Sequence, residues 1–187
     1  MRALMTATAL FLTAGCAMAQ TPAAPPAAAP APTPELVAMA TLRLADGTEA
    51  GTVQAFHGPQ GVLFRVEGQG WPQGWHGVHL HAVGQCEGPG FTSAGGHVNH
   101  PTESRPHGLL NSQGGPDLGD LQNVYAGADG TAMAEVYLPV SGHAGHDLMD
   151  ADGLAFLVHA NPDDHVSQPI GGAGARIACG VFSATAD

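Results

Sequence analysis

Several histidine and aspartate residues of this chain have the types and spacing of metal ligands. His79 and His81 form an H-x-H pair. Because successive side chains of a strand point to opposite faces, both imidazoles would lie on one face. Two nitrogen ligands on one rigid strand are half of a copper or zinc site. The pair alone is weak evidence. His159 ends an apolar segment and can supply a third imidazole, although such a histidine is more often a hydrogen-bonded core residue.

A glycine-rich segment, residues 84–123, carries further candidate ligands. His97 follows two glycines, which permit close approach of the backbone. His107, Asp117 and Asp120 come after it at the spacings of a loop. Imidazole suits both copper and zinc, and a carboxylate is acceptable in a tetrahedral zinc site. In an arbitrary loop, the two aspartates would more commonly form a solvated acidic surface.

The N-terminal segment has the features of an export signal. One positive residue precedes an apolar run that is too short for a membrane span, and Ala17-Met18-Ala19 offers a small-residue cleavage site. We therefore expect residues 1–19 to be a signal peptide and the protein to be periplasmic. A second interpretation is a lipoprotein signal ending at Gly15, with Cys16 lipidated and the protein tethered to a membrane. Thr13 is atypical of such signals, which favours soluble release.

Composition separates the remaining chain into two parts. Residues 20–34 are almost entirely Ala, Pro and Thr, a composition typical of an extended linker. Residues 35–187 are long enough to form one domain with its own core. This domain keeps two cysteines, Cys86 and Cys179, and an even pair in an exported chain is most economically a disulfide. Two buried free thiols are the alternative.

The charge of the chain restricts its partners. The formal net charge is −11, and all five basic residues are arginines scattered along the sequence. Without a basic patch, nucleic-acid binding is excluded. An acidic protein also repels an anionic substrate unless a local positive group focuses it, which makes Arg176 a residue of interest.

Hydrophobic periodicity predicts an all-β fold. Short apolar runs are separated by Gly, Asp and Pro turns, and about seven or eight strands indicate an antiparallel sandwich or barrel. The expected strands are residues 37–44, 51–56, 62–66, 78–83, 132–138, 154–159 and 176–182. Two long loops, 84–123 and 160–174, lie between them, and loops of this length are usually functional. His76 is predicted to make structural hydrogen bonds.

Six segments together carry a family resemblance. They resemble, in order, the motifs of the copper–zinc superoxide dismutases, especially the bacterial exported branch, and they cover most of the domain. The segments are G-V-H-L-H (77–81), T-S-A-G-G-H-V-N (92–99), H-G-L-L-N (107–111), G-D-L-Q-N (119–123), L-V-H-A-N-P-D-D-H (157–165) and G-G-A-G-A-R-I-A-C-G (171–180). The resemblance implies an antiparallel Greek-key sandwich or flattened barrel of about eight strands with two long functional loops.

The resemblance also implies two metal sites and a reaction. The expected activity is disproportionation of superoxide to dioxygen and hydrogen peroxide by redox cycling of copper. Copper would be bound by four histidines: His79, His81, His97 and His159. Zinc would be bound by His97, which bridges the two metals, together with His107, Asp117 and Asp120. Asp117 departs from the family pattern, which has a histidine at this position, so its part in zinc binding is a hypothesis.

Four further residues take roles from the resemblance. Asp163 would accept hydrogen bonds from a copper-ligand and a zinc-ligand histidine. Arg176 would attract and orient superoxide, and it is the expected catalytic residue beside the bridging histidine. Cys86 and Cys179 would form the disulfide.

Two rival functions and the oligomeric state stay open from the sequence. Asp117 leaves a copper-only dismutase with a weak zinc site possible. An exported copper-handling protein could reuse the same fold, but retention of Arg176 argues against it because storage needs no anion-guiding arginine. The chain could be a monomer or a homodimer.

Overall fold

β-strands make up most of the regular structure of residues 33–140 and 151–185, which this computed structural model describes. The strands are β1 Glu35–Leu44, β2 Glu49–Gly58, β3 Gly61–Gly68, β4 Gly74–His76, β5 Val78–His81, β6 Val124–Ala126, β7 Ala132–Pro139, β8 Ala155–His159, β9 Arg176–Val181 and β10 Ser183–Ala184. One 3-10 turn, η1, spans Thr92–Ala94. The described residues contain no helix long and apolar enough to cross a membrane. The proposed signal peptide, Cys16 and linker residues 20–32 lie outside the described residues.

Alternation of side chains along the strands builds the core. In β1, Ala38, Ala40 and Leu42 are buried, whereas the side chains between them are more exposed. Because a strand turns successive side chains to opposite faces, this alternation gives the sheet an apolar inner surface. Phe64 and Phe156 come from strands distant in sequence, and their ring centroids lie 6.4 Å apart in this core. Burial of such rings is a main source of stability.

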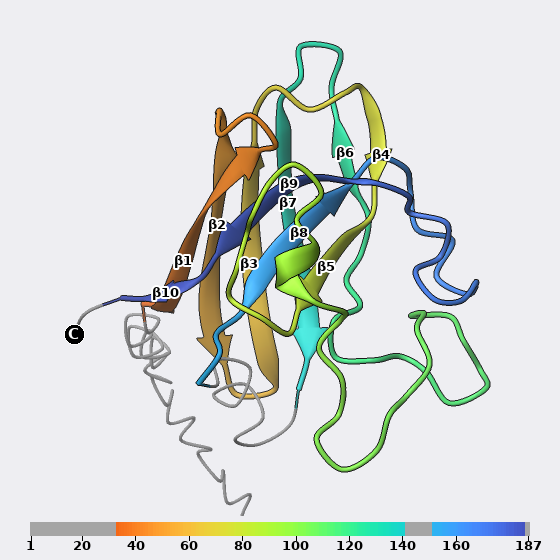
Figure 1. Cartoon of the computed structure of the whole chain (residues 1–187). Helices are drawn as coiled ribbons and strands as arrows, with labels where there is room; N and C mark the ends of the chain where they lie inside the picture. The colour runs from red at the N-terminus through yellow and green to blue at the C-terminus, as the bar shows by residue number, and fades with distance from the viewer. Residues whose placement is uncertain (1–32, 141–150, 186–187) are drawn as a thin grey trace, which may run out of the picture. The chain divides into compact units, whose positions relative to one another are not determined.

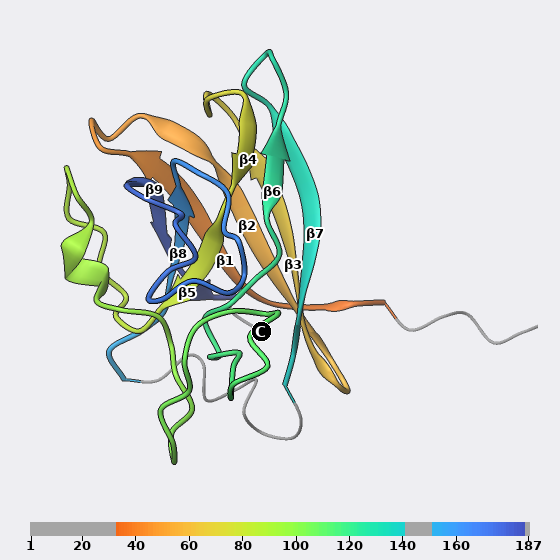
Figure 2. The same cartoon turned by 90° about the vertical axis from the view of Figure 1, so that its right-hand side faces the viewer.

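The sheet is antiparallel throughout and nearly closed. The strand order is β4-β6-β7-β3-β2-β1-β9-β8-β5, with β10 paired to β1. The two ends of this order, β4 and β5, are separated in sequence by Gly77 alone. Gly77 donates its N–H to the Asn161 carbonyl at 2.8 Å and accepts from the His159 N–H at 2.9 Å. One interrupted strand therefore closes the sheet into the barrel seen in Figures 1 and 2.

This architecture confirms the predicted all-β antiparallel fold. Counting β4 and β5 as one strand and β10 as a short extension leaves about eight strands, as expected. Sequence periodicity missed β4, β6 and β10, which have only three, three and two residues. It also extended β5 to residue 83, whereas the strand ends at His81.

Two long loops are fastened to each other and to the barrel. The first follows β5 and contains η1, and the second joins β8 to β9. Asn123 and Asp163 connect them through two hydrogen bonds, of 2.8 and 2.9 Å. A disulfide between Cys86 and Cys179, with Cα atoms 5.7 Å apart, fastens the first loop to β9. The predicted disulfide is confirmed, and the free-thiol alternative is wrong.

Candidate metal centre

Strands β5 and β8 bring three of the predicted histidines together. His79 and His81 lie on β5, and His159 ends the neighbouring strand β8. Their nearest ring nitrogens all lie within 4.8 Å of one another. His97 joins them from the first long loop through a β-bridge to His81, and its ring centroid lies 4.2 Å from that of His79. Four imidazoles from three separate segments therefore lie in one cluster.

One nitrogen of each imidazole is buried without a hydrogen-bond partner. The four atoms are His79 Nδ1, His81 Nε2, His97 Nε2 and His159 Nε2. Buried polar atoms are normally hydrogen-bonded, so four unpartnered nitrogens around one point need an explanation. A metal ion that accepts nitrogen ligands supplies it, and copper suits such an all-imidazole set.

Backbone carbonyls set the orientation of two of these rings. His81 Nδ1 donates to the Gly95 carbonyl at 2.9 Å, and His159 Nδ1 donates to the Gly174 carbonyl at 3.0 Å. Because each Nδ1 carries the proton, each Nε2 keeps a lone pair directed at the site. The Gly95 carbonyl also accepts from Arg176 Nη2 at 2.7 Å, so one oxygen holds both a candidate ligand and the arginine.

A second set of donor atoms shares His97. Its Nδ1 lies 3.1 Å from Asp117 Oδ2 and 3.6 Å from Asp120 Oδ1. His107 Nδ1 lies directly against Asp120 Oδ1, although neither atom has hydrogen-bond geometry with any partner. Two imidazole nitrogens and two carboxylate oxygens thus face one another, a donor set that suits zinc. One group of ligand atoms that all lie within 4.8 Å of one another contains His79, His97, His107 and Asp120. Asp117 is outside this group, although its Oδ2 lies 3.1 Å from His97 Nδ1.

Backbone amides hold both carboxylates in place. Asp120 Oδ2 accepts hydrogen bonds from the N–H groups of Gly108, at 2.7 Å, and Asp117, at 3.0 Å. Asp117 Oδ1 accepts from the Gly119 N–H at 2.9 Å. Each aspartate therefore commits one oxygen to the backbone and directs the other toward His97. This arrangement limits the freedom of the shorter side chain at residue 117.

Asp163 connects the two sets of donors. Its Oδ2 accepts from His79 Nε2 at 2.7 Å, and its Oδ1 accepts from His107 Nε2 at 3.1 Å. The carboxylate is buried between them. By holding the proton of each ring on Nε2, it leaves Nδ1 of each ring available as a ligand. This is the position that the resemblance implies for Asp163.

Burial keeps three histidines of the first set neutral: His79, His81 and His159. It lowers the pKa of His79, an effect only partly offset by the hydrogen bond to Asp163. Burial is also the main cause that lowers the pKa of His81 to about 2 and that of His159 to about 4. Neutral imidazoles have the free lone pairs that metal binding requires.

Carboxylates dominate the electrostatics of the second set. Burial alone would lower the pKa values of His97 and His107, but their aspartate partners outweigh it and raise both, that of His107 to about 10. Burial would likewise raise the pKa values of Asp120 and Asp163, but the adjacent histidines and hydrogen bonds from backbone N–H groups hold both well below the usual range. The Asp120 and Asp163 carboxylates therefore stay ionised, which favours a cation.

Similarity to known proteins agrees with this geometry. The family described as copper/zinc superoxide dismutase matches residues 49–182 of the chain. The chain belongs to the copper/zinc superoxide dismutase family. A relative named copper–zinc superoxide dismutase from Caulobacter vibrioides is 50% identical over 149 residues, which cover 78% of this chain and 84% of the relative.

Solved structures of the superoxide dismutase family share the fold. A superoxide dismutase-like protein from Bacillus subtilis is 30% identical, with a TM-score of 0.70 over 76% of this chain and 96% of that one. The copper–zinc superoxide dismutase of Brucella abortus is 31% identical, with a TM-score of 0.63 over 76% of this chain and 97% of that one. Both support the Greek-key architecture expected for the family.

The metal centre opens to solvent through a hollow of about 660 Å³. Its lining includes His81, His97, His107, Asp117 and Arg176. The Arg176 guanidinium donates to two backbone carbonyls, at 2.6 and 2.7 Å. These hydrogen bonds hold it in place, and because carbonyls are uncharged they do not neutralise its positive charge. A fixed positive group in a concave site can bind a small anion.

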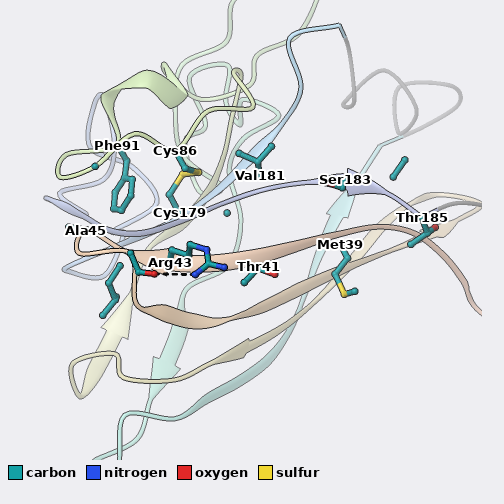
Figure 3. A pocket seen from close by; sticks show the side chains of 15 residues that line it. Met39, Thr41, Arg43, Ala45, Cys86, Phe91, Cys179, Val181, Ser183 and Thr185 are labelled. Carbon is teal, nitrogen blue, oxygen red and sulfur yellow. Dashed lines mark hydrogen bonds between the residues drawn. A yellow bond between two sulfur atoms is a disulfide. The ribbon is translucent and has the colours of Figure 1, made fainter.

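A second hollow, of about 650 Å³, lies beside the disulfide and contains none of the predicted ligands. Figure 3 shows it between β1, β9 and the loop that carries Cys86 and Phe91. Its charged side chain is Arg43, which donates to the Gly47 carbonyl at 3.1 Å.

Sequence reasoning missed the residues that hold Asp163. Asn123 accepts from the Asp163 N–H and donates to its carbonyl, and the His165 N–H donates to Asp163 Oδ1 at 2.6 Å. A Cβ on Gly171 would collide with that same oxygen. Asn123 and Gly171 lie inside the segments that resemble the superoxide dismutases, but only their place beside Asp163 in the fold explains them.

Proposed function

We propose that this protein is a copper–zinc superoxide dismutase that converts two superoxide anions and two protons to dioxygen and hydrogen peroxide. The observation that carries the proposal is a cluster of four imidazoles, each with a buried unpartnered nitrogen, next to a carboxylate-rich site that shares His97. The relative from Caulobacter vibrioides, named a copper–zinc superoxide dismutase, supports the same function.

The metals are assigned by the chemistry of the donors. Copper would be held by His79 Nδ1 and by the Nε2 atoms of His81, His97 and His159, and it would supply a one-electron redox couple. Zinc would be held by His97 Nδ1, His107 Nδ1, Asp117 and Asp120, and it would supply positive charge without redox chemistry. The unpartnered buried nitrogens fit the four copper ligands and His107, whereas His97 Nδ1 is hydrogen-bonded to Asp117 Oδ2 at 3.1 Å.

His97 and Arg176 would act directly in the reaction. Arg176 lines the hollow together with His81 and His97, so it would bind the superoxide anion and orient it toward the metal centre. The Nε2 atom of His97, which lacks a protein partner, would hold either copper or a proton, and it would donate that proton to the peroxide product. Asp163 would hold His79 and His107 in the tautomers that bind metal.

A test is superoxide consumption by disulfide-intact protein loaded with copper, with and without zinc. Rapid consumption that needs both metals would support the full proposal. Equal activity with copper alone would favour a copper-only dismutase. Tight copper binding without consumption would point to copper handling and contradict the proposal.

A copper-only dismutase is the second candidate because Asp117 and Asp120 can orient His97 without a metal. Both carboxylates approach His97 Nδ1, at 3.1 and 3.6 Å. Asp117→His tests the zinc assignment. If zinc affinity, measured by chelator competition, is the same in this variant, Asp117 is not a ligand.

We also propose that residues 1–19 direct export and that residues 35–187 form the domain that works in the periplasm. The support is the composition of the N-terminal 34 residues. Cys16→Ser separates release from lipid anchoring, because only an anchored protein would move from the membrane to the soluble fraction. Sedimentation of the mature protein would distinguish a monomer from a homodimer.

A further inference from the structure

The four arginines of the described residues fall into two electrostatic classes. Arg65 and Arg105 form ion pairs with Glu135 and Glu103, respectively. Arg43 and Arg176 instead donate to backbone carbonyls. A carbonyl does not neutralise a guanidinium, whereas a carboxylate does. In an acidic protein, the partner of each arginine therefore decides whether that arginine attracts an anion.

Arg105 and Arg176 are the two arginines that line the hollow of the metal centre. Arg105 lies in the first long loop, between His97 and His107. Its backbone is fixed by Asn99, which accepts from the Arg105 N–H at 2.8 Å and donates to the Arg105 carbonyl at 2.9 Å. The loop thus holds the Arg105 side chain beside the opening through which a small anion must pass.

Glu103 neutralises the charge of Arg105. Its Oε1 accepts from Arg105 Nε at 2.7 Å and from Nη2 at 2.5 Å. Both side chains are exposed, at 40% for Arg105 and 58% for Glu103, so the pair contributes little to stability. Its main physical effect is on the field at the opening, because it cancels one of the two positive charges there.

We propose that Glu103 is a positioning residue that limits capture of superoxide by pairing with Arg105. The inference rests on the proposed function and concerns the rate of anion capture, not the chemistry at the metals. The chain carries a formal net charge of −11, so an approaching anion depends on local positive charge. Removing the Glu103 charge would leave Arg105 free to act together with Arg176.

The test compares three variants of the metal-loaded protein by the bimolecular rate of superoxide consumption. Glu103→Gln should raise the rate roughly twofold at low ionic strength, the scale of one unit charge at a water-exposed site. Arg105→Gln, which leaves Glu103 unpaired, should lower it by a similar factor. The double variant, which restores the local net charge, should return to the parent rate. Added salt should reduce all differences.

Glu135→Gln is the matched control. Glu135 pairs with Arg65 through the same two guanidinium nitrogens, and this pair lies on β3 and β7, outside the lining of the hollow. The substitution changes the net charge of the protein by the same amount, so it should leave the rate unchanged. Equal rates for Glu103→Gln and Glu135→Gln would overturn the proposal.

Anion binding gives a readout independent of turnover. The affinity of the copper-loaded protein for azide, a small monovalent anion, can be titrated optically, and Glu103→Gln should increase it by a similar factor. An unchanged azide affinity would also overturn the proposal. If no variant consumed superoxide, the proposed function would fail, while the azide titration would still decide whether Glu103 controls the field.

Discussion

Replacement of Asp163 by asparagine should weaken one of the two metal sites selectively. Asp163 Oδ1 accepts two hydrogen bonds, from His107 Nε2 at 3.1 Å and from the His165 N–H at 2.6 Å. Its Oδ2 accepts one, from His79 Nε2 at 2.7 Å. An asparagine has one oxygen and one amide nitrogen. The oxygen should take the position with two donors, which leaves the amide nitrogen facing His79.

This orientation of the asparagine would weaken the copper site. A donor opposite His79 Nε2 forces the proton of that ring to Nδ1, the atom assigned to copper. Loss of such a supporting contact typically costs about 10–100-fold in metal affinity. We therefore expect copper affinity to fall by about 1.4–2.7 kcal/mol. Zinc affinity should change less, because His107 keeps its acceptor.

Competition with chelators of known affinity would measure each metal separately in Asp163→Asn. The matched control is Asp164→Asn, because Asp164 is exposed and accepts from the backbone N–H groups of Val166 and Ser167, not from a candidate metal ligand. The control should bind both metals with unchanged affinity. A variant that lost zinc affinity while keeping copper affinity would refute the reasoning about asparagine orientation.

Three further outcomes follow from the fold. Gly171→Ala should weaken binding of both metals because its Cβ would displace the Asp163 carboxylate. Gly172→Ala, also at positive φ but in open space, should show only backbone strain, and chelator competition would distinguish the two variants. Removal of the Cys86–Cys179 disulfide should lower the free energy of unfolding by about 4–5 kcal/mol in urea titrations, because the bond closes a loop of 93 residues. Zinc binding should release protons near neutral pH, because the pKa of His107 is raised to about 10 and the zinc-free ring is charged below it. Zinc affinity should therefore rise with pH up to that pKa. Calorimetry in buffers of different ionisation enthalpy measures the protons released on zinc binding, and release of none would contradict the prediction.

The clustering of the candidate ligands could be predicted from the sequence because residue type and strand alternation carry that information. His79 and His81 share a face of β5, as the H-x-H spacing predicts, and His159 ends a strand beside them. His76 also makes the predicted structural hydrogen bonds, to the carbonyls of His159 and Pro72. These outcomes depend on local pattern, which a sequence displays directly.

The supporting contacts could not be predicted because they depend on backbone conformation in the loops. The Gly95 and Gly174 carbonyls orient His81 and His159, and no residue type reveals where a carbonyl points. Likewise, the short strands that complete the barrel have too few residues to show a period. Their pairing is determined by the tertiary fold.

The closure of the barrel has a consequence for aggregation. An open sheet offers free edges to other chains, and the interrupted strand at Gly77 removes them by pairing on both sides. The seam between β5 and β8 is short, with four residue pairs against eight between β2 and β3. The imidazoles assigned to copper lie on both β5 and β8, so a bound copper ion would link the two strands. Loss of copper would then expose the unpaired backbone edges of β5 and β8 and favour intermolecular β-pairing.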